Sequence, residues 1–269
     1  MTAVVGIARR LMGRNVRVAV RALIVVASLP ALSHAADLLD TISRVKQSVV
    51  AVGTYSPTRA PQFEFRGTGF VVGDGSLIAT NYYVLPETTS DASREKLAIL
   101  VTASPGAATQ VREVQRVAAD EGSDLALLKL PGPALPALEL RDSDSVREGQ
   151  PVLMTGYPIG AVLGPFPATH RGMVAAITPI AIPQRRAADL GSAVIRRLAG
   201  GTFLVFQLDA TAYPGNSGSP IYDPSTGQVF GIVNMVFVKG TKESALSQPS
   251  GITYAVPARH LSELMKTLR

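Results

Sequence analysis

The sequence predicts an all-β protein, because short apolar runs alternate with Gly, Pro, Ser and Asp turn signals along most of the chain. A first series of these runs lies between Ser48 and Lys129, and a second lies between Gln150 and Val256. A Pro-rich connector, residues 131–140, separates the two series. After Pro257, leucines and a methionine recur at helical spacing. We therefore expect two β units and a short C-terminal amphipathic helix that packs against the second unit.

Each apolar run has the length and the content of Val, Ile and Leu expected of a strand. The runs of the first series cover residues 47–52, 63–72, 76–80, 97–102, 111–120 and 125–130. Those of the second series cover residues 150–157, 171–177, 202–210, 227–237 and 252–256. The closing helix is expected over residues 257–268.

The first 35 residues have the three parts of an export signal. Five arginines and no acid precede an apolar run, Ala22 to Leu32, and small residues lead up to a cleavage point after Ala35. We therefore expect residues 1–35 to be a signal peptide and the mature protein to be periplasmic or secreted. The apolar run is short for a membrane span. An uncleaved anchor, which would hold the protein at a membrane, is the alternative.

Charge and composition exclude several classes of protein. The chain has 26 basic and 20 acidic residues, but five of the basic ones lie in the signal, so the mature protein is close to neutral. Its basic pI therefore does not indicate a nucleic-acid partner. Cysteine is absent and only three histidines occur, His34, His170 and His260. The sequence predicts no disulfide, no metal site and no cofactor.

Ser217 is the strongest candidate for a reactive side chain. It lies in the run GNSGSP, residues 215–220, which follows the apolar stretch Phe203–Leu208. Glycines on both sides of a serine predict a tight turn that exposes the hydroxyl and directs backbone N–H groups toward one point. Acyl transfer needs such a nucleophile together with donors for the tetrahedral oxyanion. An ordinary Gly-Ser turn between two strands is the alternative.

Three further segments resemble a known family. Residues 67–84, 123–130 and 140–160 are similar to the base segment, the aspartate segment and the start of the second barrel in trypsin-like serine peptidases of the HtrA/Deg type. The chain order of the base position, Asp124 and Ser217 is also that of chymotrypsin-fold enzymes. The resemblance implies two six-stranded antiparallel β-barrels, residues 40–139 and 140–269 including the C-terminal helix, which together form one peptidase domain.

The resemblance also implies the roles of individual residues. Ser217 would be the nucleophile, Asp124 the carboxylate that orients a base, and the backbone N–H groups of Gly215 and Ser217 the oxyanion donors. A pocket without an acid at its floor would favour small or medium apolar side chains. The residues expected near this pocket are Thr211, Val233 and Met235.

Tyr83 departs from the family pattern, because it stands where Thr80, Asn81 and Val84 fix the position of the catalytic histidine. A phenol with a pKa of about 10 stays protonated at pH 7, whereas an imidazole with a pKa of about 6.5 can accept the serine proton. Loss of the histidine costs on the order of 10⁶ in turnover in a comparable peptidase. We expect the Tyr83 hydroxyl to donate to Asp124. Neither His170 nor His260 is expected to replace the base.

Two other departures concern the chain's organisation. Because the sequence ends at Arg269, we expect no PDZ module of the kind that many HtrA-type members carry. Residues 178–202 are longer than the family's corresponding connection. They are expected to form either a helix over the cleft or a neighbouring subunit, or a surface loop.

Three functions from different classes remain open. The first is a pseudopeptidase that binds an extended peptide or unfolded protein by strand addition without cutting it. The second is a serine endopeptidase with an unconventional base. The third is a regulatory or structural subunit with a vestigial cleft. The oligomeric state, including a homo-oligomer, is also left open.

Overall fold

The computed structural model describes residues 29–86, 94–102, 109–160, 164–179, 203–234 and 251–268. The chain divides into two compact units, Met1–Thr41 and Ile42–Arg269. Most of the expected signal, most of the long 178–202 connection, and Met235 lie outside the described residues. Helix α2 (Leu29–Lys46) ends with Arg44 and Lys46 in its last turn, where positive charge favours a helix C-terminus. Within the described residues, no helix combines the length and hydropathy needed to cross a membrane.

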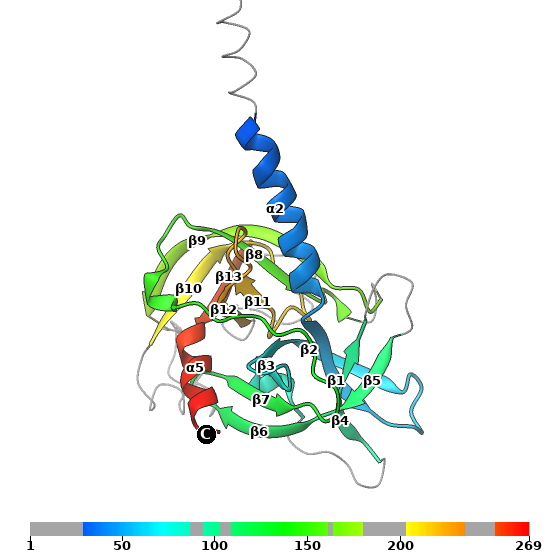
Figure 1. Ribbon diagram of the computed structural model, residues 1–269. Helices are drawn as coiled ribbons and strands as arrows, with labels where there is room; N and C mark the ends of the chain where they lie inside the picture. The colour runs from blue at the N-terminus through cyan, green and yellow to red at the C-terminus, as the bar shows by residue number, and fades with distance from the viewer. Residues whose placement is uncertain are drawn as a thin grey trace, which may run out of the picture. The chain divides into compact units, whose positions relative to one another are not determined.

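The first β unit is a seven-stranded antiparallel sheet (Figure 1). Its strand order is β5-β4-β1-β2-β3-β7-β6, so β5 and β6 form the two edges. Only Val114 separates these edge strands in the chain, and the expected single run 111–120 is thus divided by a bend that connects one edge to the other. The strands are β1 (Val49–Tyr55), β2 (Phe63–Val72), β3 (Leu77–Asn81), β4 (Lys96–Val101), β5 (Gln110–Glu113), β6 (Gln115–Asp120) and β7 (Leu125–Lys129).

The second β unit is a closed six-stranded barrel with the order β10-β13-β12-β11-β8-β9. All of its strand pairs are antiparallel, as expected. The strands are β8 (Pro151–Gly156), β9 (Ala168–Pro179), β10 (Leu204–Asp209), β11 (Pro220–Tyr222), β12 (Val229–Asn234) and β13 (Ile252–Pro257). The all-β, two-unit prediction is therefore confirmed.

Each β unit encloses its own apolar core. Burial of one large apolar side chain stabilises a fold by about 1.5–3 kcal/mol, so these clusters are the main source of stability. The first core includes Val50, Val52, Val71, Ile78 and Leu128. The second includes Val152, Met154, Phe206, Leu208 and Phe230.

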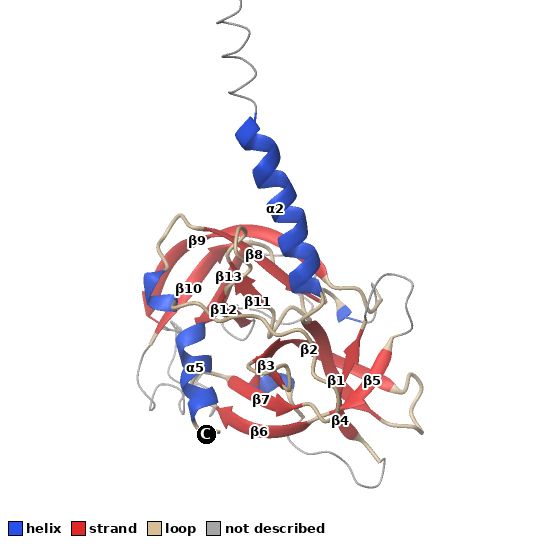
Figure 2. Cartoon of the chain, viewed as in Figure 1, coloured by secondary structure: helices blue, strands red, loops and turns tan. Residues whose placement is uncertain are grey.

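Helix α5 (Ala258–Lys266) closes the chain, as predicted (Figure 2). Its apolar face buries Leu261 and Leu264. The helix contacts β6 and β7 of the first unit as well as β12 of the second. It therefore packs against both β units, whereas the sequence indicated packing on the second alone.

Thr68 of β2 connects the first β unit to the second beside Ser217. Its backbone N–H donates to the Ser217 carbonyl (2.8 Å), and its hydroxyl donates to the Gly215 carbonyl (2.7 Å). The same hydroxyl accepts from the backbone N–H of Tyr157 (3.0 Å), and the buried Tyr157 hydroxyl donates to the Val49 carbonyl (3.3 Å). Burial raises the pKa of Tyr157 to about 12, so its hydroxyl stays protonated. The turn that carries Ser217 is thus held at the junction of the two β units.

Candidate active site

The structure brings Ser217, Tyr83 and Asp124 together. The Tyr83 hydroxyl is in hydrogen-bond contact with Ser217 Oγ. The backbone N–H of Tyr83 donates to Asp124 Oδ1 (3.0 Å). Asp124 is fully buried and Ser217 is nearly so, whereas Tyr83 is 36% exposed. Two hydroxyls and a buried carboxylate therefore meet, and they come from the turn that follows β3, the turn that precedes β11 and the residue that precedes β7.

The Tyr83 contact differs from the one we expected. The Tyr83 side-chain hydroxyl contacts Ser217. The bond from Tyr83 to Asp124 comes from the Tyr83 backbone N–H instead. The reason is the 3₁₀ turn Tyr82–Val84, which follows β3 directly. The Tyr82 N–H and the Asn81 side-chain amide both donate to the Asp124 carbonyl, at 3.0 and 3.2 Å. These two bonds to the Asp124 carbonyl fix the turn and direct the Tyr83 ring toward Ser217.

Asp124 has a partner that the sequence did not indicate. The side-chain amide of Asn234, at the end of β12, donates to Asp124 Oδ2 (2.7 Å), and both residues are fully buried. Asp124 itself has a left-handed backbone with φ of 57°, a conformation that Asp tolerates better than most residues. A buried carboxylate needs such donors, because transfer of an unpaired charge from water is costly.

Two glycines shape the turn around Ser217. Gly215 and Gly218 have φ of 101° and 86°, which side chains rarely adopt. A Cβ at Gly215 would lie 2.3 Å from the Tyr157 carbonyl oxygen, and one at Gly218 would lie 2.0 Å from that of Thr68. Only glycine fits either position. Among the described residues, the backbone N–H groups of Gly215 and Ser217 donate to no other backbone group.

Behind this turn lies a polar cluster without bonding partners among the described atoms. Both side-chain polar atoms of Asn216 and the Ser219 hydroxyl are fully buried and make no hydrogen bond. A Cβ at Gly156 would lie 1.9 Å from Ser219 Oγ and 3.1 Å from Asn216 Oδ1. A side chain at position 156 would therefore collide with the Ser219 hydroxyl, and glycine avoids this collision.

The expected pocket residues lie in different environments. Thr211 is partly exposed, so its side chain is accessible from solvent. Val233 is fully buried within the core of the second barrel, and its main chain bonds to Gly218 and Ser219 on the turn that carries Ser217. Its contribution to the site is therefore through the backbone.

Neither described histidine contacts Ser217 in the structure. His170 faces the Tyr213 ring at 6.1 Å, and His260 lies 4.6 Å from the Phe203 ring. The Nε2 atoms of both histidines are buried without a partner in the described chain. His260 lies in the first turn of α5, at a helix end, and partial burial lowers the pKa of both histidines. Among the described residues, no group of three or more His, Cys, Asp and Glu could hold a metal ion.

Sequence comparison identifies related proteins. A family model for the trypsin-like peptidase domain matches residues 67–232. The protein named "Probable periplasmic serine endoprotease DegP-like" of Ectopseudomonas mendocina (strain ymp) is 29% identical over 204 residues, or 74% of this chain and 35% of that protein. The magnetosome formation protease MamE of Paramagnetospirillum magneticum is 30% identical over 242 residues, or 81% of this chain and 29% of MamE. The chain spans about a third of these relatives.

Solved structures show the same fold. The HtrA-type protease AlgW with a tripeptide has a TM-score of 0.61 and 22% identity, covering 86% of this chain and 63% of AlgW. AlgW with a decapeptide gives a TM-score of 0.60 at 22% identity, covering 86% of this chain and 66% of that one. The two β units and the C-terminal helix therefore form the chymotrypsin-like architecture of HtrA-type proteases.

Proposed function

Because the chain belongs to the trypsin-like peptidase family, we propose that it is an exported relative of HtrA-type serine endoproteases that binds extended peptides and cleaves them poorly. In this proposal Tyr83 occupies the position of the general base. Ser217 is the nucleophile without an effective proton acceptor, and Asp124 is the carboxylate that would orient a base.

The contact between the Tyr83 hydroxyl and Ser217 Oγ carries this proposal. To attack a carbonyl, the serine must transfer its proton to a neighbour as the new bond forms. With an ordinary pKa of about 10, only about one phenol in a thousand is ionised at pH 7. The phenol can therefore share a hydrogen bond with Ser217, but it rarely accepts the proton. Binding is retained while the chemical step is slow.

The glycine turn supports the peptide-binding part of the proposal. The N–H groups of Gly215 and Ser217 have no other backbone acceptor among the described residues, so they can donate to a carbonyl of a bound chain. AlgW, which has the same fold, carries a tripeptide or a decapeptide in its solved structures. An extended peptide or a segment of an unfolded protein is therefore the proposed ligand.

The proposed location is the periplasm, or the exterior beyond it. The N-terminal charge and hydropathy pattern supports export, and the DegP-like relatives are named periplasmic. Removal of residues 1–35 would cut within the segment that forms helix α2. N-terminal sequencing of the exported protein tests this part of the proposal.

The central test is the exchange of Tyr83 for histidine. Hydrolysis of fluorescently labelled casein is measured for the unmodified chain, Tyr83→His, and Tyr83→His combined with Ser217→Ala. We expect Tyr83→His to raise turnover by about 100-fold or more, the usual contribution of a general base, and the added Ser217→Ala to abolish the gain. Tyr82→His is the matched control, because it makes the same exchange one residue earlier on the same turn.

A different result would support an active endopeptidase with an unconventional base. If the unmodified chain cleaves casein at ordinary peptidase rates, and Ser217→Ala removes that activity, the proposed impairment is wrong. Labelling of Ser217 by an organophosphonate gives an independent measure, because a serine without a base should react slowly. Binding of an unfolded, labelled peptide is measured separately by fluorescence anisotropy, and its absence would contradict the peptide-binding part.

A further inference from the structure

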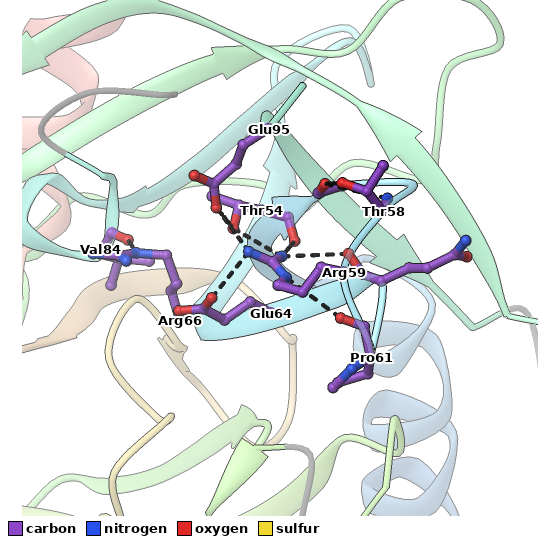
Figure 3. A network of polar contacts seen from close by, with 10 residues as sticks. Thr54, Thr58, Arg59, Pro61, Glu64, Arg66, Val84 and Glu95 are labelled. Atoms are coloured by element: carbon purple, nitrogen blue, oxygen red, sulfur yellow. Dashed lines mark hydrogen bonds and ion pairs between the residues drawn. The ribbon is translucent and has the colours of Figure 1, made fainter. Parts of the chain in front are cut away.

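Two arginines near the start of β2 have different surroundings, as Figure 3 shows. Arg59 lies in the loop between β1 and β2, and Arg66 lies on β2 itself. In Figure 3, the Arg59 side chain is enclosed by Thr54, Glu64 and Glu95. The Arg66 side chain extends toward Val84 instead.

The charge of Arg59 is neutralised within the fold. Its Nη1 lies 3.0 Å from a Glu64 oxygen and 2.8 Å from a Glu95 oxygen. Its Nη2 donates to the carbonyl and the hydroxyl of Thr54, at 2.6 and 3.1 Å. The guanidinium is thus occupied with holding the β1–β2 loop to the start of β4.

Arg66 is held in place, but no acid among the described residues forms an ion pair with it. Its Nε donates to the Val84 carbonyl (2.7 Å), which fixes the orientation of the planar guanidinium. The side chain is exposed, and in the described part of the chain it forms no ion pair. Glu64, two residues before Arg66 on β2, is bonded to Arg59. The terminal Nη donors of Arg66 therefore remain available to a ligand.

The Arg66 guanidinium lies next to the candidate active site. Val84, its anchor, directly follows Tyr83. The next residues of β2 contact the nucleophile turn, since a Cβ at Gly67 would lie 3.1 Å from the Ser217 carbonyl oxygen and the Thr68 N–H donates to that oxygen. One strand thus carries the free guanidinium and, two residues later, the bond to Ser217. A chain bound across Ser217 would pass close to Arg66.

We propose that Arg66 is a specificity-determining residue that binds a carboxylate of the peptide lying in the Ser217 cleft. A guanidinium presents paired N–H donors that match the two oxygens of a carboxylate. The carboxylate belongs either to an Asp or Glu side chain or to the C-terminus of the bound chain. This inference rests on the proposed peptide-binding function and adds a preference for acidic ligands.

Anisotropy with labelled decapeptides tests the preference and its source. The reference peptide has no acid and an amidated C-terminus. One set replaces a single Gln with Glu at each position in turn, and another peptide has a free C-terminal carboxylate. We expect one of these carboxylates to strengthen binding roughly three- to tenfold, the range of a partly exposed charge-assisted contact. The gain should shrink when NaCl is raised from about 0.05 to about 0.5 M.

Charge variants assign the effect to Arg66. In Arg66→Gln the gain should fall to within about twofold of the reference peptide, whereas Arg66→Lys should keep part of it because the charge remains without the paired geometry. Arg147→Gln is the matched control, because it also removes the charge of an exposed arginine. Arg147 lies four residues after Ser143, whose hydroxyl accepts a hydrogen bond from the backbone of the C-terminal helix α5. Thermal melts check that each variant is folded.

The outcomes separate the two proposals. If the reference peptide binds but no carboxylate strengthens binding, or if the gain persists in Arg66→Gln, the Arg66 inference is wrong and peptide binding stands. If no peptide binds to any of the proteins, the peptide-binding function and the inference fail together. Loss of the gain in Arg66→Gln but not in Arg147→Gln supports the assignment.

Discussion

Replacement of Asn234 tests the strongest side-chain contact made by the buried Asp124. Asn234→Leu conserves the approximate volume and removes the donor that lies 2.7 Å from Asp124 Oδ2. Both residues are fully buried, so water does not replace the lost bond. Hydrogen bonds to charged groups contribute about 1.5–3 kcal/mol. We therefore expect the free energy of unfolding to fall by about 2–3 kcal/mol, which for a chain of this size corresponds to a Tm lower by roughly 5–10 °C.

A double-mutant cycle separates this contact from general effects of packing. Asp124→Asn removes the charge while retaining a residue type that tolerates the left-handed backbone at this position, where φ is 57°. If Asn234 acts mainly on the carboxylate, Asn234→Leu should cost much less in the Asp124→Asn background. The expected coupling free energy is about 1.5 kcal/mol or more.

Urea and thermal denaturation followed by circular dichroism measure the four proteins of the cycle. Coincident transitions by fluorescence and circular dichroism establish that each unfolds in two states. A coupling below about 0.5 kcal/mol, within the range of independent sites, would refute the argument that Asn234 stabilises the Asp124 carboxylate.

Two further predictions concern the nucleophile turn and the C-terminal helix. Gly218→Ala should destabilise the protein by several kcal/mol, because the added Cβ would lie 2.0 Å from the Thr68 carbonyl oxygen. Gly149→Ala, at a similar φ of 83° but with no atom within 4 Å of the added Cβ, should cost only the roughly 1–2 kcal/mol of backbone strain. Equal losses of stability in urea denaturation would contradict the packing argument. Burial lowers the pKa of His260, so the unfolded chain binds more protons, and Tm should fall as the pH drops below about 6.5. His260→Gln should weaken this dependence, and an unchanged Tm profile between pH 7.5 and 5 would show that His260 does not contribute to it.

Most of the fold follows from local patterns in the sequence. Eleven apolar runs cover twelve of the thirteen strands in the described residues, with β5 and β6 falling within one expected run. The missed strand, β11 (Pro220–Tyr222), is three residues long and depends on pairing with β8 and β12. The break at Val114 likewise has no turn residue to mark it and depends on the strand order, which places β5 and β6 at opposite edges of the sheet.

Some features of the candidate site can likewise be predicted from local sequence motifs, whereas others depend on contacts between residues that are distant in the chain. The sequence motif places Tyr83 in the register that meets Ser217, and the two residues are in contact. The direction of the Tyr83 hydroxyl was mispredicted, because it depends on the 3₁₀ turn at Tyr82–Val84. Asn234 was missed because its partner Asp124 is 110 residues away. The different environments of Arg59 and Arg66 depend on tertiary contacts in the same way.

If Tyr83 stands at the position of the general base, as proposed, the contacts around it explain how this position can change without loss of the fold. Asp124 receives a backbone N–H from residue 83, and any residue except proline supplies that donor. The Tyr83 side chain is 36% exposed, so the position accommodates rings of different size. By contrast, Gly218 and Asp124 are required by the packing at the junction of the two β units. Under the proposed function, a tyrosine at this position impairs proton transfer while these contacts maintain the turn that carries Ser217, and Tyr83→His should change turnover far more than it changes stability.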